Sequence, residues 1–190
     1  RLISGYTAEA GVRGLKKQLD VLCRSAAVKL VKGEQKSISV SEKRLPQFLG
    51  HHEIRHEHVL ANKEPGVITG LAWTAAGGEI LFIETSLAPG KGNLIITGQL
   101  GDVMKESART GLSYIRSVSD DYELDPEYFQ QHDIHIHIPE GAVPKDGPSA
   151  GITMATAMLS AVLNKPVRAD VAMTGEITLR GRVLPIGGLK

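Results

Sequence analysis

The stretch Pro144-Lys145-Asp146-Gly147-Pro148-Ser149-Ala150-Gly151 decides how this chain is interpreted. Upstream, residues 134–138 alternate isoleucine and histidine with period two, which predicts a half-buried strand. Downstream, residues 152–163 are nearly all apolar or small, which predicts a helix of about three turns. The stretch therefore places Ser149 between a strand that has ended and a helix that begins.

Ser149 is the candidate nucleophile. Pro148 suits the first turn of a helix, because its missing N–H is not needed there. Ser149 would then lie among unpaired backbone N–H groups at the positive end of the helix dipole, and such donors hold the oxyanion of acyl transfer. The alternatives are a helix cap or a plain Gly/Pro turn. The spacing fits neither a P-loop nor a G-x-S-x-G elbow. The residues alone leave these readings open.

Length and composition predict one globular domain, or one domain with a fragment of another. The 190 residues are 42% hydrophobic, 23% charged and only 4% aromatic, so the core must be mainly aliphatic. A net charge of +1 gives no general attraction to nucleic acid or membranes. The single cysteine, Cys23, excludes an internal disulfide and fits a reducing compartment. No run reaches the roughly 18 apolar residues of a membrane helix. Without a signal pattern or Met, the chain begins like the middle of a longer protein.

Periodicity predicts an α+β fold in two parts. The first part has an amphipathic helix over 11–32, a short strand over 38–40 and a short helix capped by Ser41 and running toward residue 49. A polar, histidine-rich linker follows, and its spacing fits no standard zinc site. In the second part we expect strands over 67–74, 79–87, 93–97, 133–138, 171–173 and 176–184, and helices over 101–118 and 152–163. Strands followed by mixed helices and strands are typical of α+β domains.

The Ser149 stretch resembles the active-site signature of the Lon (endopeptidase La) family of ATP-dependent proteases. The resemblance covers practically the whole chain, including residues 9–13, 101–107, 171–181 and 183–190. It implies the C-terminal end of an AAA+ α-helical lid over 1–50, a linker over 51–64 and a Lon-type proteolytic domain, truncated before its C-terminal part, over 65–190. The resemblance is closest to bacterial members, which implies a cytoplasmic protein rather than one of the mitochondrial matrix.

The resemblance also implies a Ser-Lys dyad. By residue type alone, His135 and His137 on one strand face would suit a Ser-His-Asp triad with Asp133 or Asp146. Lon proteases instead use a lysine, whose pKa falls when it is desolvated. In the family pattern Gly-Gly-Leu-Lys-Glu-Lys the second lysine is catalytic, and this chain ends on the first, Lys190. We therefore expect the dyad lysine two positions beyond Lys190, and an inactive isolated fragment.

Several other residues receive roles from the resemblance. Thr174 would orient the dyad lysine, although a plain turn threonine would look the same. Asp146, with Pro148 and Ala150, would shape the loop around the nucleophile. Trp73 and Glu84 would line the substrate groove, with core packing as the alternative for Trp73. Arg13 matches the sensor 2 arginine, which meets the terminal phosphate of the nucleotide, or it is simply solvated.

The resemblance implies partners beyond this chain. The sequence has no Walker motif, so we expect no cofactor here, no metal, and ATP with Mg²⁺ only in the ATPase core of a longer parent. Unfolded proteins would be the substrates, and a homohexamer the assembly; DNA binding by the parent is not indicated here. One rival is a non-proteolytic Lon-like assembly or DNA-handling module, against which the intact Ser149 loop argues. Another is a metal-dependent enzyme using His135 and His137.

Overall fold

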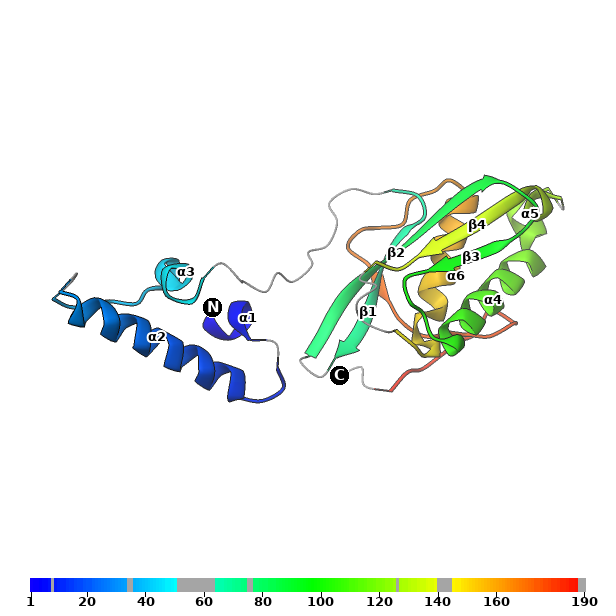
Figure 1. Cartoon of the computed structure of the whole chain (residues 1–190). Helices are drawn as coiled ribbons and strands as arrows, with labels where there is room; N and C mark the ends of the chain where they lie inside the picture. Colours follow the sequence, from blue (N-terminus) through cyan, green and yellow to red (C-terminus); the bar gives the residue numbers. More distant parts are fainter. Residues whose placement is uncertain are drawn as a thin grey trace. The chain divides into compact units, whose positions relative to one another are not determined.

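The computed structural model describes residues 1–7, 9–33, 36–50, 64–74, 77–125, 127–139 and 145–187. These residues form two compact units, a small, mainly helical one and a larger one with helices and sheets (Figure 1). Each unit has its own apolar cluster. The fold class is α+β, as the sequence predicts. The predicted linker up to residue 63, the hairpin tip at 75–76 and residues 188–190, including Lys190, lie outside the described residues.

The first unit consists of short helices around one longer helix. Its elements are α1 (Leu2–Tyr6), α2 (Arg13–Val31), the 3-10 turn η1 (Glu42–Arg44) and α3 (Leu45–Leu49). A small buried cluster of Tyr6, Leu22, Leu45 and Phe48 joins them. The predicted long helix is confirmed by α2. The short helix is also confirmed, but Ser41 makes no side-chain capping hydrogen bond.

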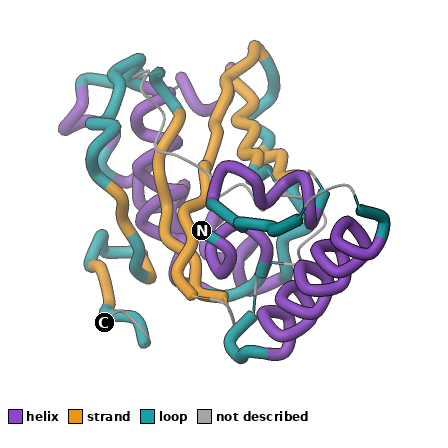
Figure 2. Tube along the Cα trace, turned by 90° about the vertical axis from the view of Figure 1, so that its left-hand side faces the viewer, coloured by secondary structure: helices purple, strands orange, loops and turns teal. Residues whose placement is uncertain are grey.

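The strand expected over residues 38–40 is wrong. Within residues 1–50, the described residues form helices and loops only (Figure 2). A strand needs a neighbour to pair its backbone N–H and C=O groups, and the described part of this unit supplies none. Ile38 instead packs its side chain against the small apolar cluster.

The second unit is built on a mixed sheet of five strands in the order β3-β4-β2-β1-β5. β2 and β4 are antiparallel, whereas β3 with β4 and β1 with β5 are parallel. The strands are β1 (Val67–Thr74), β2 (Gly77–Pro89), β3 (Leu94–Thr97), β4 (His132–His137) and β5 (Ala172–Met173). All five lie where the sequence predicts strands, and β2 extends slightly beyond its expected range at both ends.

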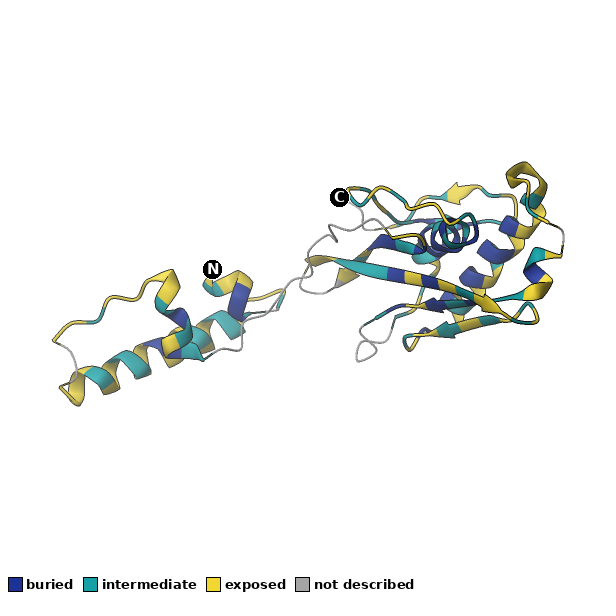
Figure 3. Cartoon of the chain, turned by 90° about the horizontal axis from the view of Figure 1, so that it is seen from above, coloured by how far each residue is buried: buried dark blue, intermediate teal, exposed yellow. Residues whose placement is uncertain are grey.

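Two helices, α4 (Asp102–Ser117) and α6 (Gly151–Val162), cover one face of this sheet. Figure 3 shows buried residues gathered where the helices face the strands. Ile134 and Ile136 of β4 are buried there with Met154 and Met158 of α6. The alternation along β4 thus directs its isoleucines to the core, as expected of a half-buried strand. The shorter elements are η2 (Ser119–Tyr122), α5 (Tyr128–Gln131) and η3 (Pro148–Ala150).

The single strand expected over residues 176–184 is also wrong. This segment folds back on itself as a two-stranded hairpin of β6 (Glu176–Ile177) and β7 (Val183–Leu184). The N–H of Thr178 donates to the carbonyl of Arg182 over 2.9 Å, and the Thr178 hydroxyl accepts from the N–H of Arg182 over 3.1 Å. Gly181 has φ +75°, which glycine adopts without steric cost. The apolar pattern was right, but the turn within it was missed.

Candidate active site

Ser149 lies in the 3-10 turn η3, immediately before helix α6. The turn begins at Pro148, whose fixed φ suits the first helical position. The N–H of Gly151 donates to the carbonyl of Pro148, so the turn leads directly into α6. Ser149 is half-buried. The structure therefore places this residue at a helix start, as the sequence predicts.

Thr174 reaches Ser149 from a segment 25 positions later in the chain. Its Oγ1 donates to the backbone carbonyl of Ser149 over 3.1 Å, and the N–H of Gly175 donates to the same carbonyl over 2.6 Å. The carbonyl of Gly175 accepts in return from the N–H of Ile152 over 3.0 Å. Thr153 adds a bond from its hydroxyl to the carbonyl of Met173, over 2.9 Å. These bonds fix the Thr174 turn against the start of α6.

Ser149 and Thr174 line the same pocket, which has a volume of about 410 Å³. The hairpin of β1 and β2 forms one wall, and residues that follow β7 form another. The described residues that line it are Leu71, Ala72, Trp73, Gly78, Glu79, Ile80, Ser149, Thr174, Ile186 and Gly187. The structure thus brings three residues singled out in the sequence, Trp73, Ser149 and Thr174, into one cavity. Trp73 is 77% exposed, so it is not a core residue.

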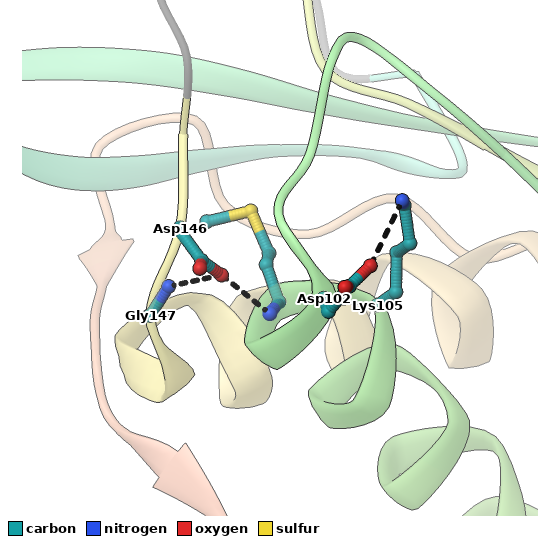
Figure 4. A network of polar contacts seen from close by, with 5 residues as sticks. Asp102, Lys105, Asp146 and Gly147 are labelled. Atoms are coloured by element: carbon teal, nitrogen blue, oxygen red, sulfur yellow. Dashed lines mark hydrogen bonds and ion pairs between the residues drawn. The ribbon is translucent and has the colours of Figure 1, made fainter.

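Asp146 connects the Ser149 loop to helix α4 (Figure 4). Its Oδ1 accepts from the N–H of Met104 over 3.1 Å and from the N–H of Gly147 over 2.9 Å. Met104 is the third residue of α4, and the N-cap position is Gly101, which has no side chain to cap the helix. Asp146 therefore supplies from a distant segment the acceptor that an N-cap side chain normally provides. The same carboxylate fixes the backbone just before Ser149.

The other residues singled out near the site are absent from the described lining of the pocket. Glu84 is exposed on β2 and pairs with His137 in the strand register, away from the described lining of the pocket. Lys145 donates from Nζ to the carbonyl of Pro139 over 2.8 Å. Pro148 and Ala150 flank Ser149 within η3. The structure thus separates Glu84 from the group formed by Trp73, Ser149 and Thr174.

The histidines of the alternative triad do not meet Ser149. The Oγ1 of Thr97 lies 3.0 Å from Nε2 of His135 and 2.7 Å from Nδ1 of His137. Both rings alternate with Ile134 and Ile136, which face the helices, so they occupy the opposite sheet face from α6. The structure does not bring them together with Ser149.

Asp133 accepts hydrogen bonds from the turn that precedes β3. Its Oδ1 accepts from the N–H groups of Lys91 and Asn93, each over 2.8 Å, and from Nδ2 of Asn93 over 3.0 Å. Hydrogen bonds from Asn93 and then Lys91 lower the pKa of the Asp133 carboxyl group, because they favour its charged form. Asp133 thus holds the turn that precedes β3.

Arg13 is exposed at the first position of α2. The Glu9 carboxylate accepts from the N–H of Gly14 over 2.8 Å and from that of Leu15 over 3.0 Å, and these bonds lower the Glu9 pKa. Glu9 therefore already occupies the anion-attracting start of α2. A phosphate could meet the guanidinium of Arg13, but it would compete with Glu9 for these N–H groups.

No group of three or more His, Cys, Asp or Glu side chains is placed to hold a metal ion within the described part of the chain. None of its described helices is both long and apolar enough to cross a membrane.

Most of the pocket wall consists of residues that the sequence did not single out. Leu71 and Ala72 precede Trp73, and Glu79 and Ile80 follow the hairpin turn on the neighbouring strand. A signal was available, because residues at equal distances from a hairpin turn lie side by side. Once Trp73 was singled out, the positions across the turn were candidates as well.

Two family models match the chain. The Lon protease (S16) C-terminal proteolytic domain matches residues 39–190, and the Lon protease AAA+ ATPase lid domain matches residues 1–38. A Lon protease of Bacillus thuringiensis (strain Al Hakam) is 59% identical over 189 residues, which is 100% of this chain and 24% of that protein. Lon protease 1 of Bacillus subtilis (strain 168) is 57% identical and also covered to 24%, with all of this chain matched. The Lon protease of Aquifex aeolicus (strain VF5) is 56% identical over 191 residues, which is 100% of this chain and 24% of that protein.

The chain therefore spans about a quarter of the length of the curated relatives that it matches. The match to the proteolytic domain includes the Ser149 turn, the Thr174 turn and the hairpin that walls the pocket. On this basis the chain belongs to the Lon protease family.

Proposed function

We propose that this chain carries the nucleophile of an ATP-dependent serine endopeptidase, and that Ser149 is that nucleophile. The observation that supports this most directly is the shared pocket of Ser149 and Thr174, walled by the β1–β2 hairpin, in a chain of the Lon protease family. A peptide carbonyl could approach the Ser149 hydroxyl within this pocket. Proteins with misfolded or unfolded segments would be the substrates.

The proposed chemistry is acyl transfer to serine with a lysine as the base. As the Ser149 oxygen bonds to the peptide carbonyl carbon, its proton passes to the amine of a lysine two positions beyond Lys190. The C–N bond then breaks, the leaving amine takes that proton, and an ester remains on Ser149. Water then attacks the ester and gives a proton to the lysine, which passes it to the Ser149 oxygen as the C–O bond breaks and the free acid leaves. Desolvation in the pocket would keep the lysine neutral enough for this role.

Thr174 would orient that lysine. Its hydroxyl proton is directed at the carbonyl of Ser149, which leaves the lone pairs of Oγ1 to accept from an amine or ammonium group. The oxyanion would be held by the N–H groups of Ser149 and Ala150. The N–H groups of the next two residues, Gly151 and Ile152, donate instead to the carbonyls of Pro148 and Gly175.

The substrate would bind as an added strand along β1. β5 pairs with β1 at Thr69 and Gly70, and β1 continues to Thr74. The part of β1 beyond this pairing, from Leu71 to Trp73, lines the pocket. Main-chain hydrogen bonds to such a strand edge hold an extended peptide, and pockets beside it select side chains. A peptide bound there would pass in front of Ser149.

We propose that residues 1–50 are the C-terminal end of the ATPase lid, 51–64 the linker, and 65–190 the proteolytic domain. α3 supports this boundary, because Leu45 and Phe48 share the small cluster with Leu22 of α2. ATP and Mg²⁺ would bind in an ATPase core outside this chain, with Arg13 directed at the nucleotide. The assembly would be a homohexamer in the bacterial cytoplasm, consistent with bacterial relatives.

Hydrolysis of a fluorogenic peptide tests the proposal. Three proteins are compared: the full-length protein, its Ser149→Ala variant, and a version that ends at Lys190. Activity is expected only in the first. Activity that survives Ser149→Ala would overturn the role of the serine. Equal activity in the version that ends at Lys190 would overturn the position of the lysine.

A further inference from the structure

Glu79 is a charged residue in the pocket that the proposed mechanism does not use. Among the described residues that line the pocket, it alone carries a charge; the others are apolar residues, glycines, Ser149 and Thr174. Glu79 lies near the start of β2, just after the hairpin turn, and it is exposed. Its carboxylate is therefore a solvent-accessible negative charge in a largely apolar cavity.

The strand geometry directs Glu79 to the same side of the sheet as the nucleophile. A Cβ built on Gly70 of β1 would lie 3.1 Å from the Leu81 side chain and 3.4 Å from that of Thr153 in α6. Leu81 therefore faces α6, and so does Ile83, which is fully buried. Because alternate residues of a strand share a face, Glu79 points to the α6 side. Ser149 opens α6, so carboxylate and nucleophile lie on the same side of the sheet.

The charge of Glu79 has no ion-pair partner within the described part of the chain, where the ion pairs involve other residues. A carboxylate that is not neutralised gives its cleft a negative potential, and this attracts cations. The rest of the described lining is largely apolar, and it includes Ala72, which alternates with Gly70 on β1 and so shares this face, and Ile186. A lysine or arginine side chain matches this arrangement, because its long stem packs on apolar surface while its charged end reaches a carboxylate.

We propose that Glu79 selects substrates with a basic side chain close to the scissile bond and disfavours acidic ones. This inference rests on the proposed function, since it concerns the peptide that Ser149 cleaves. Glu79 is thus a specificity-determining residue. The reaction itself does not require Glu79, so a peptide with a neutral residue at the same position is cleaved with or without it.

The test uses the full-length protein and sets of peptides that are identical except at one position. That position, taken in turn on each side of the scissile bond, carries Lys, Gln or Glu. At low salt the unmodified protein is expected to cleave the Lys peptide about two- to fivefold faster than the Gln peptide in kcat/KM, the size of an exposed ion pair. Glu79→Gln removes this preference, and Glu79→Lys transfers it to the Glu peptide. High salt weakens the preference, because exposed charges are screened.

The matched control is Glu106→Gln, which removes the same charge from an exposed position of α4 outside the described pocket lining. It should keep the Lys preference. An unchanged ratio of Lys to Glu cleavage in Glu79→Lys would overturn the inference, as would an equal loss of cleavage of all three peptides in Glu79→Gln. Cleavage that persists in Ser149→Ala would instead overturn the proposed function, whatever the Glu79 variants do.

Discussion

The hydroxyl of Thr174 donates a hydrogen bond to the backbone carbonyl of Ser149, and the two atoms are 3.1 Å apart. The N–H of Gly175 donates to the same carbonyl over 2.6 Å. The backbone of the candidate nucleophile is therefore held by a turn from a later part of the chain, between β5 and β6. A change in this turn should alter the position of Ser149 without touching its hydroxyl.

Thr174→Val removes the hydroxyl at nearly constant volume. We expect the free energy of unfolding to fall by about 1 kcal/mol, the usual net contribution of one hydrogen bond. Peptide cleavage by the full-length protein should fall on the order of tenfold or more, because small displacements of reacting groups are costly. Thr174→Ser, which keeps the hydroxyl, should recover most of the cleavage. Similar losses in both variants would contradict this expectation, because the hydroxyl that Thr174→Ser retains would then not be sufficient for cleavage.

Gly175→Ala tests the tight packing of the same turn. Gly175 has φ +155°, and a Cβ there would lie 2.5 Å from the Cγ1 of Val183 in β7. We expect a loss of about 2 kcal/mol or more, from overpacking together with an unfavourable backbone conformation. Urea denaturation measures it, and cleavage should fall as well. Gly187→Ala is the comparison, since nothing lies within 4 Å of a Cβ at that position; equal destabilisation by both changes would contradict the packing argument.

Asp146→Ala removes the acceptor that joins the Ser149 loop to α4. The N–H groups of Met104 and Gly147 would lose their partner, and a lost helix cap costs about 1 kcal/mol. We expect a lower melting temperature and slower cleavage. Asp146→Asn keeps an acceptor oxygen but cannot take up a proton as a carboxylate does. Retained cleavage in Asp146→Asn would support a positioning role, whereas a loss equal to that of Asp146→Ala would indicate that the charge itself is needed.

The lowered pKa of Asp133 predicts how the stability of the protein changes as the pH falls. Its pKa is lower in the folded protein than in the unfolded chain, where an aspartate titrates at about 4. Between these two pKa values the unfolded chain binds more protons, so lowering the pH favours unfolding. The contribution of Asp133 is therefore complete above about pH 4 and is lost as the pH falls through the folded pKa.

Urea denaturation between neutral pH and about pH 3 measures this loss. Asp133→Asn should lower the stability at neutral pH and make the decline below about pH 4 shallower than in the unmodified protein. The control is Asp121→Asn, an exposed position in η2. A decline in Asp133→Asn as steep as in this control would assign the acid sensitivity to other carboxyl groups.

The sequence by itself determined most elements of this fold. Side-chain periodicity is set by local geometry, about 3.6 residues per helical turn and two per strand, so it is readable without knowing what packs against each face. The helix that begins after Ser149 and the alternating strand at His132–His137 were predicted for this reason. The two wrong predictions, at residues 38–40 and 176–184, concerned short apolar segments, for which pairing rather than periodicity decides the structure.

Only the tertiary structure decided which distant residues meet. Thr174 reaches Ser149 through hydrogen bonds between a turn and a helix start, and Glu79 joins their pocket because β2 runs beside β1. The alternation along β4 predicts that His135 and His137 share a face, but not that helices α4 and α6 cover the other one. A sequence pattern gives the direction of a side chain relative to its own strand or helix. What lies opposite depends on strand order and helix packing, which are set by burial of the whole core.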